Sequence, residues 1–128
     1  MPKKPRPARP RVIVTRRLPA SVEERMTQLF DTVLNPNDEP MSRAELAAAM
    51  ADCDVLVPTV TDHLDAELIE AAPERLQMIA SFGSGVDHID LAAARKKGVI
   101  VTNTPGVLTD DTADMVMALI IAVPRRLA

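Results

Sequence analysis

The sequence has almost no aromatic side chains: its 128 residues include two phenylalanines, no tryptophan and no tyrosine. Nucleic-acid bases therefore have almost no aromatic side chains to stack on, which argues against binding of single-stranded nucleic acid. Cys53 is the only cysteine, so an internal disulfide is impossible, and no metal-ligand spacing surrounds it. We therefore expect a reduced, cytoplasmic protein without a metal site.

Long hydrophobic runs are also absent. The longest, MVMALIIAV at residues 115–123, is far shorter than the roughly 20 residues that a membrane span needs. The first eleven residues, MPKKPRPARPR, lack the apolar region of a signal peptide and predict a disordered basic tail over residues 1–11. Without that tail the chain carries a net charge of about −8, which argues against a nucleic-acid or membrane partner.

Apolar strand-like segments alternate with helical segments along the rest of the chain. Strands are predicted at residues 11–15, 31–35, 54–58, 77–81 and 99–102, and helices at 20–30, 42–53, 65–72, 90–98 and 109–128. Ser42 and Glu45 form a capping-box pattern, Ser21 and Thr109 are further cap signals, and Gly98 ends a helix.

Repeated strand-helix units with nearly all-apolar strands predict a particular fold class. We expect one flavodoxin-like α/β domain over residues 12–108, with a doubly wound parallel sheet covered by helices on both faces. Such sheets bind ligands at the carboxyl ends of their strands. The loops after residues 57, 81 and 102 are therefore where we expect the chemistry.

The final segment, residues 109–128, departs from this rhythm. Asp110, Asp111 and Asp114 favour a helix N-terminus there, and the helix then continues apolar almost all round. A helix of that kind needs a covering partner, and no further element follows in the sequence. We therefore expect a helix that is cut short and an apolar surface that promotes self-association or poor solubility.

The stretch SFGSGVDHID, residues 81–90, resembles a dinucleotide-binding loop at first sight. The G-x-G-x-x-G fingerprint fails, however, because His88 replaces the third glycine and no acid follows about 20 residues after Gly83. Gly83 and Gly85 still allow backbone N–H groups to approach an anionic oxygen closely. A tight strand-to-helix turn without any ligand is the alternative.

Other polar residues carry no clear catalytic pattern. His63 and His88 have no carboxylate at a spacing that would tune either as a general acid, so we assign them to helix starts or loop packing. The pairs Asp87/Asp90 and Asp110/Asp111 are interpreted as charges at helix N-termini rather than as a catalytic dyad or a metal site. No catalytic residue is assigned.

Four motifs follow one another in the second half of the chain: TDHLDAELIEAAP, GSGVDHIDL, KKGVIVTNTPGVLTDDTAD and RRL. With them the chain resembles the D-isomer-specific 2-hydroxyacid dehydrogenases, most of all the glyoxylate and hydroxypyruvate reductases. The first 53 residues fit that family only loosely. The resemblance implies a homodimeric NAD- or NADP-dependent oxidoreductase that reduces a small 2-oxo acid to the D-2-hydroxy acid.

The resemblance also implies roles for particular residues. The backbone N–H groups of Ser84, Gly85 and Val86 would receive the substrate carboxylate, and Val60 would form the opposite wall. Ser84 and Thr112 would lie beside the cofactor. The family's catalytic arginine, glutamate and histidine, and its glycine-rich cofactor loop, have no counterpart in this sequence.

The resemblance therefore implies an N-terminal portion of such an enzyme. Residues 12–108 would form the substrate domain, and residues 109–128 would begin the helix that leads to an absent cofactor domain. We expect the isolated chain to be inactive. A non-enzymatic flavodoxin-like interaction or co-regulator module is the alternative, because a shared fold does not transmit activity.

Overall fold

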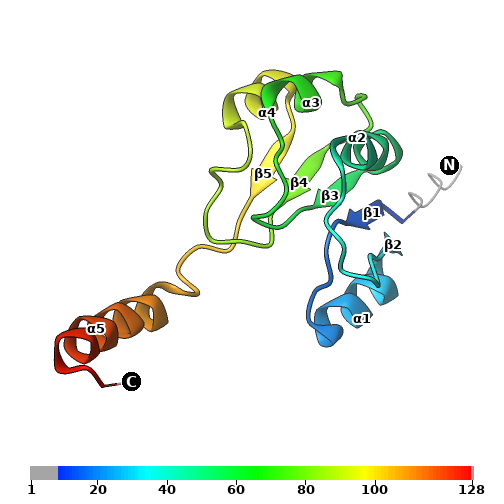
Figure 1. Cartoon of the computed structure of the whole chain (residues 1–128). Coiled ribbons are helices and arrows are strands. Elements are labelled where there is room, and N and C mark those ends of the chain that lie inside the picture. Colours follow the sequence, from blue (N-terminus) through cyan, green and yellow to red (C-terminus); the bar gives the residue numbers. More distant parts are fainter. Residues whose placement is uncertain (1–8, 128) are drawn as a thin grey trace, which may run out of the picture.

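The computed structural model describes residues 9–127. Five parallel strands form its central sheet, in the order β2-β1-β3-β4-β5. The strands are β1 (Arg11–Val14), β2 (Asp31–Val33), β3 (Val55–Val57), β4 (Met78–Ala80) and β5 (Ile100–Thr102). The helices are α1 (Ala20–Leu29), α2 (Arg43–Asp52), α3 (Ala66–Ala71), α4 (Leu91–Lys97) and α5 (Thr109–Arg125). Every predicted strand and helix is present, so the predicted fold class is confirmed (Figure 1).

The strand order changes direction between β1 and β3. The chain first moves outward from β1 to the edge strand β2, then crosses back to place β3 on the other side of β1. In register, Ile13 of β1 pairs with Val33 of β2 and with Leu56 of β3. The loops that leave β1 and β3 therefore begin beside each other, at the switch point where doubly wound sheets place ligand sites.

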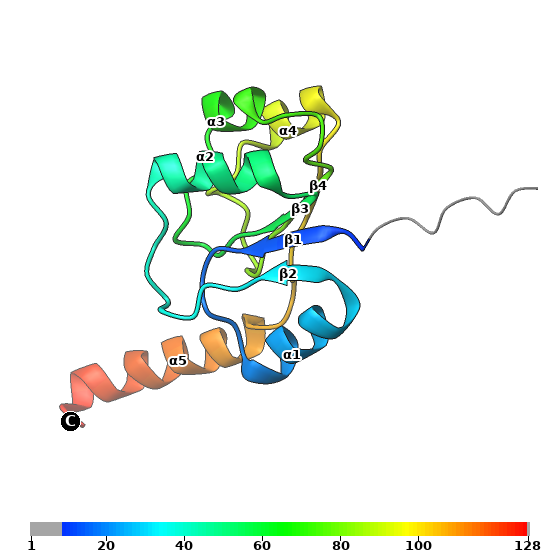
Figure 2. The ribbon, with the colours of Figure 1, turned by 90° about the vertical axis from the view of Figure 1, so that its right-hand side faces the viewer.

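Helices cover both faces of the sheet unequally. Figures 1 and 2 show α2, α3 and α4 on one face and α1 on the other. The larger core lies under the three helices, and its fully buried side chains include Met50, Leu56, Leu64, Ile69 and Ile79. The smaller core lies against α1 and consists of Val12, Val14, Leu18 and Val57, with Val22 and Met26 packed against it.

Two helix ends follow the predicted signals. The Ser42 side chain accepts from the Glu45 N–H, and the Glu45 carboxylate accepts from the Ser42 N–H at 2.7 Å, so the capping box is confirmed. Gly98 ends α4 with a φ of 76°, a conformation that glycine adopts at little cost.

The two other cap predictions are wrong. The N-cap of α1 is Pro19, so Ser21 lies inside the helix, and the Glu23 carboxylate accepts from the Leu18 N–H at 2.8 Å. The Pro19 carbonyl accepts from the Val22 and Glu23 N–H groups at 2.8 and 3.1 Å, so the helix starts there without a side-chain cap. The N-cap of α5 is Leu108, and Thr109 is the first helical residue.

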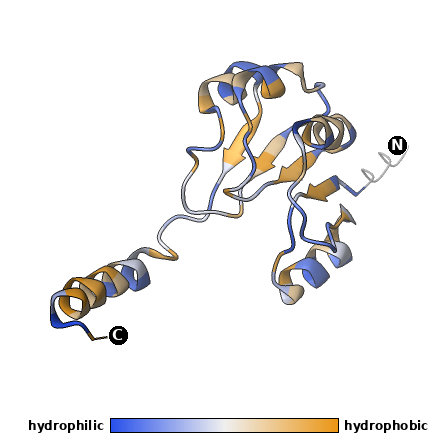
Figure 3. Ribbon diagram, viewed as in Figure 1, coloured by the Kyte–Doolittle hydropathy of each residue, from blue (hydrophilic) through white to orange (hydrophobic). Residues whose placement is uncertain are grey.

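Helix α5 extends away from the rest of the molecule (Figure 1). None of its residues is buried, and it continues through Pro124 to Arg125. Figure 3 shows apolar residues along most of its length. No helix in the described part of the chain is both long and apolar enough to cross a membrane.

The predicted tail lies only partly within the described residues, because residues 1–8 are outside them. Arg11 is the first residue of β1. Its guanidinium donates to the Asp31 carboxylate at 3.0 Å and to that of Asp52 at 2.8 Å. These ion pairs lie at the amino edge of the sheet, opposite the loops considered next.

Candidate functional site

Two loops lie side by side at the carboxyl edge of the sheet. Residues 59–62 follow β3 and form the Val60 turn, and residues 83–87 follow β4 and form the glycine loop. The Phe82 N–H donates to the Pro58 carbonyl at 2.8 Å, and Thr59 and Phe82 form an isolated parallel bridge. This bridge continues the β3–β4 pairing past the strands, so the turn and the loop leave the sheet as neighbours.

Val60 contacts the backbone of the glycine loop. A Cβ atom on Gly83 would lie 2.7 Å from Val60 Cγ1, closer than side chains tolerate. Gly85 is less constrained, since its nearest neighbour would be Asp87 Oδ2 at 3.4 Å. The Val60 side chain is 60% exposed, so it forms a wall beside the loop without closing over it.

The segment after β5 anchors the glycine loop from the other side. The Thr104 N–H donates to the Gly83 carbonyl at 3.0 Å, and the Ser84 hydroxyl donates to the Thr104 carbonyl at 3.0 Å. The Asn103 side-chain amide donates to the Ser84 carbonyl at 2.7 Å. These three bonds use carbonyls of the loop and the Ser84 side chain, and they occupy no N–H group of the loop.

Three N–H groups of the glycine loop consequently have no acceptor within the described part of the protein. Within residues 9–127, those of Ser84, Gly85 and Val86 donate to no protein acceptor. The Val86 carbonyl accepts from the Ile89 N–H at 3.0 Å, which fixes the exit of the loop. Successive free N–H groups in a turn of this kind can bind an anion. The loop therefore makes the strand-to-helix turn and also presents donors.

The two residues predicted to lie beside a cofactor are both in accessible positions. The Ser84 hydroxyl already donates to the Thr104 carbonyl, so it can serve an external group only as an acceptor. Thr112 is exposed in the first turn of α5, where its N–H donates to the Leu108 carbonyl at 3.0 Å.

Sequence reasoning missed a buried carboxylate beneath the Val60 turn. Asp62 is 3% exposed, and its Oδ2 accepts from the Thr15 hydroxyl at 2.5 Å and from the Thr59 N–H at 2.8 Å. The loop after β1 was not among the loops expected to matter, although Thr15 ends an apolar strand at the same edge. A polar residue at the carboxyl end of that strand was the signal that could have pointed to this cluster.

His88 closes the far end of the glycine loop. Its Nε2 lies 3.2 Å from Ser81 Oγ in a hydrogen bond, and its carbonyl accepts from the Leu64 N–H at 2.8 Å. Burial lowers the pKa of His88 below its ordinary value of 6.5, although Asp62 and Asp87 oppose this. The prediction of loop packing for His88 agrees with this position.

The lowered pKa of His88 predicts a pH-dependent stability. Below about pH 6.5 the unfolded chain binds a proton that the folded chain resists, so the free energy of unfolding should decrease as the pH falls from about 7 to about 5. In His88→Gln this decrease should be smaller. Urea unfolding of wild type and His88→Gln at several pH values measures this decrease. An equally steep decrease in His88→Gln and wild type would contradict the prediction.

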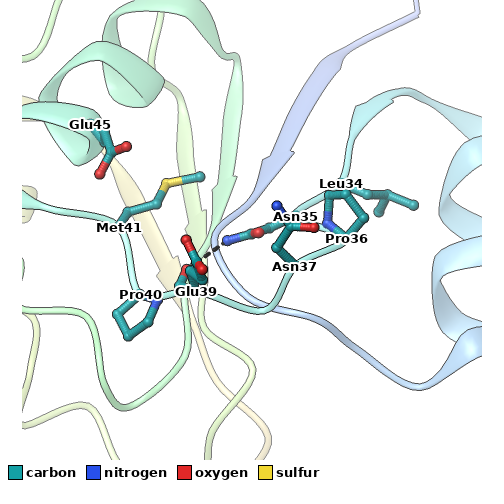
Figure 4. A pocket seen from close by; sticks show the side chains of 8 residues that line it. All are labelled: Leu34, Asn35, Pro36, Asn37, Glu39, Pro40, Met41 and Glu45. Carbon is teal, nitrogen blue, oxygen red and sulfur yellow. Dashed lines mark hydrogen bonds between the residues drawn. The ribbon is translucent and has the colours of Figure 1, made fainter.

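A separate surface cavity of about 350 Å³ lies beside the start of α2 (Figure 4). Its polar lining includes the carboxylates of Glu39 and Glu45, and no basic side chain contributes to it. Asn35 crosses it, donating to the Glu39 carbonyl at 2.8 Å and to the Thr15 carbonyl at 2.7 Å. The negative lining makes this cavity a poor site for an organic anion.

The remaining candidates have structural roles. Asp90 is the N-cap of α4 and accepts from the Ala93 N–H at 2.8 Å, as its interpretation as a helix N-terminal charge implied. Burial raises the pKa of the Cys53 thiol to about 11, so this cysteine is a poor nucleophile. Across the described residues, no three His, Cys, Asp or Glu side chains gather where they could bind a metal ion.

Comparison with known proteins gives a consistent family. The sequence matches the model of the D-isomer specific 2-hydroxyacid dehydrogenase catalytic domain over residues 12–119. A glyoxylate reductase from Korarchaeum cryptofilum is 43% identical over 118 residues, covering 92% of this chain and 35% of that protein. One from Thermofilum pendens is 44% identical over 121 residues, covering 94% of this chain and 35% of that protein.

A solved structure agrees with these relatives. The NADPH-dependent glyoxylate/hydroxypyruvate reductase from Sinorhizobium meliloti, in complex with NADP and malonate, is 33% identical with a TM-score of 0.70. The similarity covers 90% of this chain and 34% of that one. This chain thus spans about a third of the length of the proteins it matches. The match includes residues 12–53, where the motifs fitted only loosely, and the chain therefore belongs to the D-isomer specific 2-hydroxyacid dehydrogenase family.

Proposed function

We propose that this chain is the N-terminal portion of an NAD- or NADP-dependent oxidoreductase that reduces glyoxylate or hydroxypyruvate to the D-2-hydroxy acid. Residues 12–108 form the substrate domain, and α5, which starts at Thr109, begins the helix toward a cofactor domain. The free N–H groups of Ser84, Gly85 and Val86 beside Val60 are the observation that carries this proposal. These N–H groups can donate to a carboxylate, and the apolar Val60 side chain lies beside them.

Physical chemistry favours a carboxylate at these donors. Hydrogen bonds from backbone N–H groups to an ionised oxygen are stronger than those between neutral groups, and they need no basic side chain. The branched Val60 side chain opposite the loop favours a compact organic acid over a bulky one. The relatives named glyoxylate reductase, and the similar reductase that was crystallised with malonate, support a small acid as the ligand.

The cofactor is proposed to be bound mainly outside residues 12–108. The glycine loop has no third glycine, and His88 at that position is hydrogen-bonded to Ser81. This chain would contribute only contacts from Ser84 and Thr112. A bound nicotinamide would supply the hydride, while the residues described here would orient the acid. The full-length protein is proposed to be a homodimer.

Titration of the isotope-labelled chain with glyoxylate tests the proposed binding loop. The backbone amide signals of Ser84, Gly85 and Val86 should shift together and saturate at millimolar concentration. Val60→Glu should raise the apparent Kd about tenfold, because two like charges repel by roughly 1 to 3 kcal/mol over 6 Å near a protein surface. The measurement is two-dimensional amide NMR.

Ile100→Glu is the matched control for this titration. It places the same charge on an exposed isoleucine at the start of β5, whereas the glycine loop is bonded to Asn103 and Thr104, which follow the end of that strand. This variant should bind glyoxylate as wild type does. Unchanged amide signals in wild type, or an unchanged Kd in Val60→Glu, would reject the loop as the acid's binding site.

The isolated chain is expected to turn over no substrate. Such a reduction needs a cation to polarise the oxo group and a general acid to protonate it. Arg16 beside the Val60 turn is bonded to Asp38 and Thr61, and His88 Nε2 at the end of the glycine loop is bonded to Ser81, so neither side chain is free for these tasks. Absorbance at 340 nm with glyoxylate, hydroxypyruvate and NADPH or NADH measures this. A turnover rate of about 1 to 1,000 per second would disprove the assignment of a partial active site. Stoichiometric capture of a protein partner without any acid binding would favour the co-regulator alternative.

A further inference from the structure

Three residues of the Val60 turn form a polar cluster with two residues that follow β1, and the proposed acid-binding N–H groups belong to none of them. The cluster consists of Thr15, Arg16, Thr59, Thr61 and Asp62, and we call it the Asp62 cluster. A buried carboxylate costs several kcal/mol unless hydrogen bonds compensate it. Asp62 is 3% exposed, so the donors around it must stay in place for the fold to tolerate its charge.

The inner bonds of the cluster connect the turn to the sheet. Thr15 is fully buried, and its N–H donates to the Val57 carbonyl at 3.1 Å, which continues the β1–β3 pairing. Its hydroxyl donates to Asp62 Oδ2 at 2.5 Å, and the Thr59 N–H donates to the same oxygen at 2.8 Å. The Asp62 N–H donates back to the Thr59 carbonyl at 3.1 Å, closing the turn.

The outer bonds hold the other side of the turn. Arg16 Nη1 donates to the Thr61 hydroxyl at 3.0 Å, and the Thr61 and Thr59 hydroxyls lie 3.0 Å apart. Because Thr61 accepts from Arg16, its own proton is free for Thr59, whose hydroxyl lies 3.4 Å from Asp62 Oδ2. The Asp38 carboxylate in turn accepts from Arg16 Nε at 2.9 Å. Both neighbours of Val60 are therefore hydrogen-bonded.

With its neighbours fixed, the Val60 side chain has little freedom in where it meets Gly83. Val60 Cγ1 fills the space that a side chain at position 83 would need, since a Cβ atom added to Gly83 would lie 2.7 Å from it. We propose that Asp62 is a positioning residue: through Thr15 and Thr59 it fixes Val60 against Gly83 and so sets the size of the organic acid that the glycine loop accepts. This inference rests on the proposed function.

Two readouts test the positioning role. The first is the nuclear Overhauser effect between the Val60 methyl groups and the Gly83 α-protons, which needs no ligand. The second is the ratio of Kd values for 3-methyl-2-oxobutanoate and glyoxylate from amide titrations. Wild type should show the contact and prefer glyoxylate about tenfold or more, as expected for extra methyl groups at a fixed apolar wall.

The variants separate positioning from simple stability. Asp62→Ala and Thr15→Val should lose the Val60–Gly83 contact, and their Kd ratio should fall about threefold or more. Asp62→Asn keeps an acceptor oxygen and should restore both readouts. Thr32→Val is the matched control, because it removes a half-buried hydroxyl bond to the Met26 carbonyl on the far side of β1. It should change neither readout.

The outcomes distinguish this inference from the proposed function. If Thr15→Val and Asp62→Ala lower the thermal midpoint but leave both the contact and the Kd ratio unchanged, Asp62 is only a structural residue and the inference is overturned. If wild type binds neither acid, the proposed binding loop fails. In that case the Val60–Gly83 contact alone decides whether Asp62 positions the turn: loss of the contact in the variants supports it, and retention overturns it.

Discussion

Ile79→Ala is expected to lower the free energy of unfolding by about 2 to 5 kcal/mol, the range for truncating a buried isoleucine. Ile79 is fully buried in the middle of β4, between β3 and β5. Its removal leaves a cavity under α2, α3 and α4 that the surrounding strands can fill only in part. Domains of this size are stable by about 5 to 15 kcal/mol, so the loss is a large share of the total.

Ile100→Ala provides the matched control for this prediction. It makes the same change on the neighbouring strand β5, where the isoleucine is 57% exposed. We expect a cost below about 1 kcal/mol, because little apolar area leaves the core and only strand propensity is lost. Urea unfolding followed by circular dichroism measures both variants. Similar costs for the two would show that the larger core is not where the structure places it.

The isolated chain is expected to self-associate through α5, and Ile120→Lys should weaken that association at least about tenfold. Val116, Ile120 and Val123 recur at helical spacing on α5 and are 48%, 59% and 71% exposed. An apolar surface of this kind on a monomer favours contact with another apolar surface. A lysine at its centre would have to be desolvated in any such contact, which costs well above the 1.4 kcal/mol that a tenfold change represents.

Sedimentation velocity over a range of concentrations measures this association. Val107→Lys is the matched control, since it adds the same charge at a 64% exposed valine that precedes α5. The control should associate as wild type does. A wild-type chain that remains monomeric at high concentration would contradict the prediction, and so would equal weakening by both lysines.

Local sequence signals predicted the elements well and their ends less well. The apolar runs and the helical spacing are properties of neighbouring residues, so they are visible without the fold. The capping box at Ser42 and the helix end at Gly98 were predicted because both signals involve residues within a few positions of each other. Ser21 and Thr109 failed because each helix begins one or two residues earlier than the side-chain signal suggested.

The fold class and two glycines pointed to the loop after residue 81, whereas the individual ligand-binding residues were named only by the resemblance. Resemblance to the family pointed to Ser84, Gly85 and Val86, but the motif carries no information on whether their N–H groups are free. Whether those N–H groups are free depends on which loop atoms Asn103 and Thr104 bond to. Both residues belong to the segment that follows β5. The contact between Val60 and Gly83 likewise joins two loops that are distant in the sequence.

The sequence by itself determined the class of fold, the order of strands and helices along the chain, and the family. Only the tertiary structure decided that Thr15 and Asp62, 47 positions apart, share a hydrogen bond beneath Val60. The reason is physical: periodicity and capping act between neighbours in the chain, whereas a buried carboxylate finds its donors through the pairing of β1 with β3. That pairing exists only once the crossover through β2 and α2 has formed.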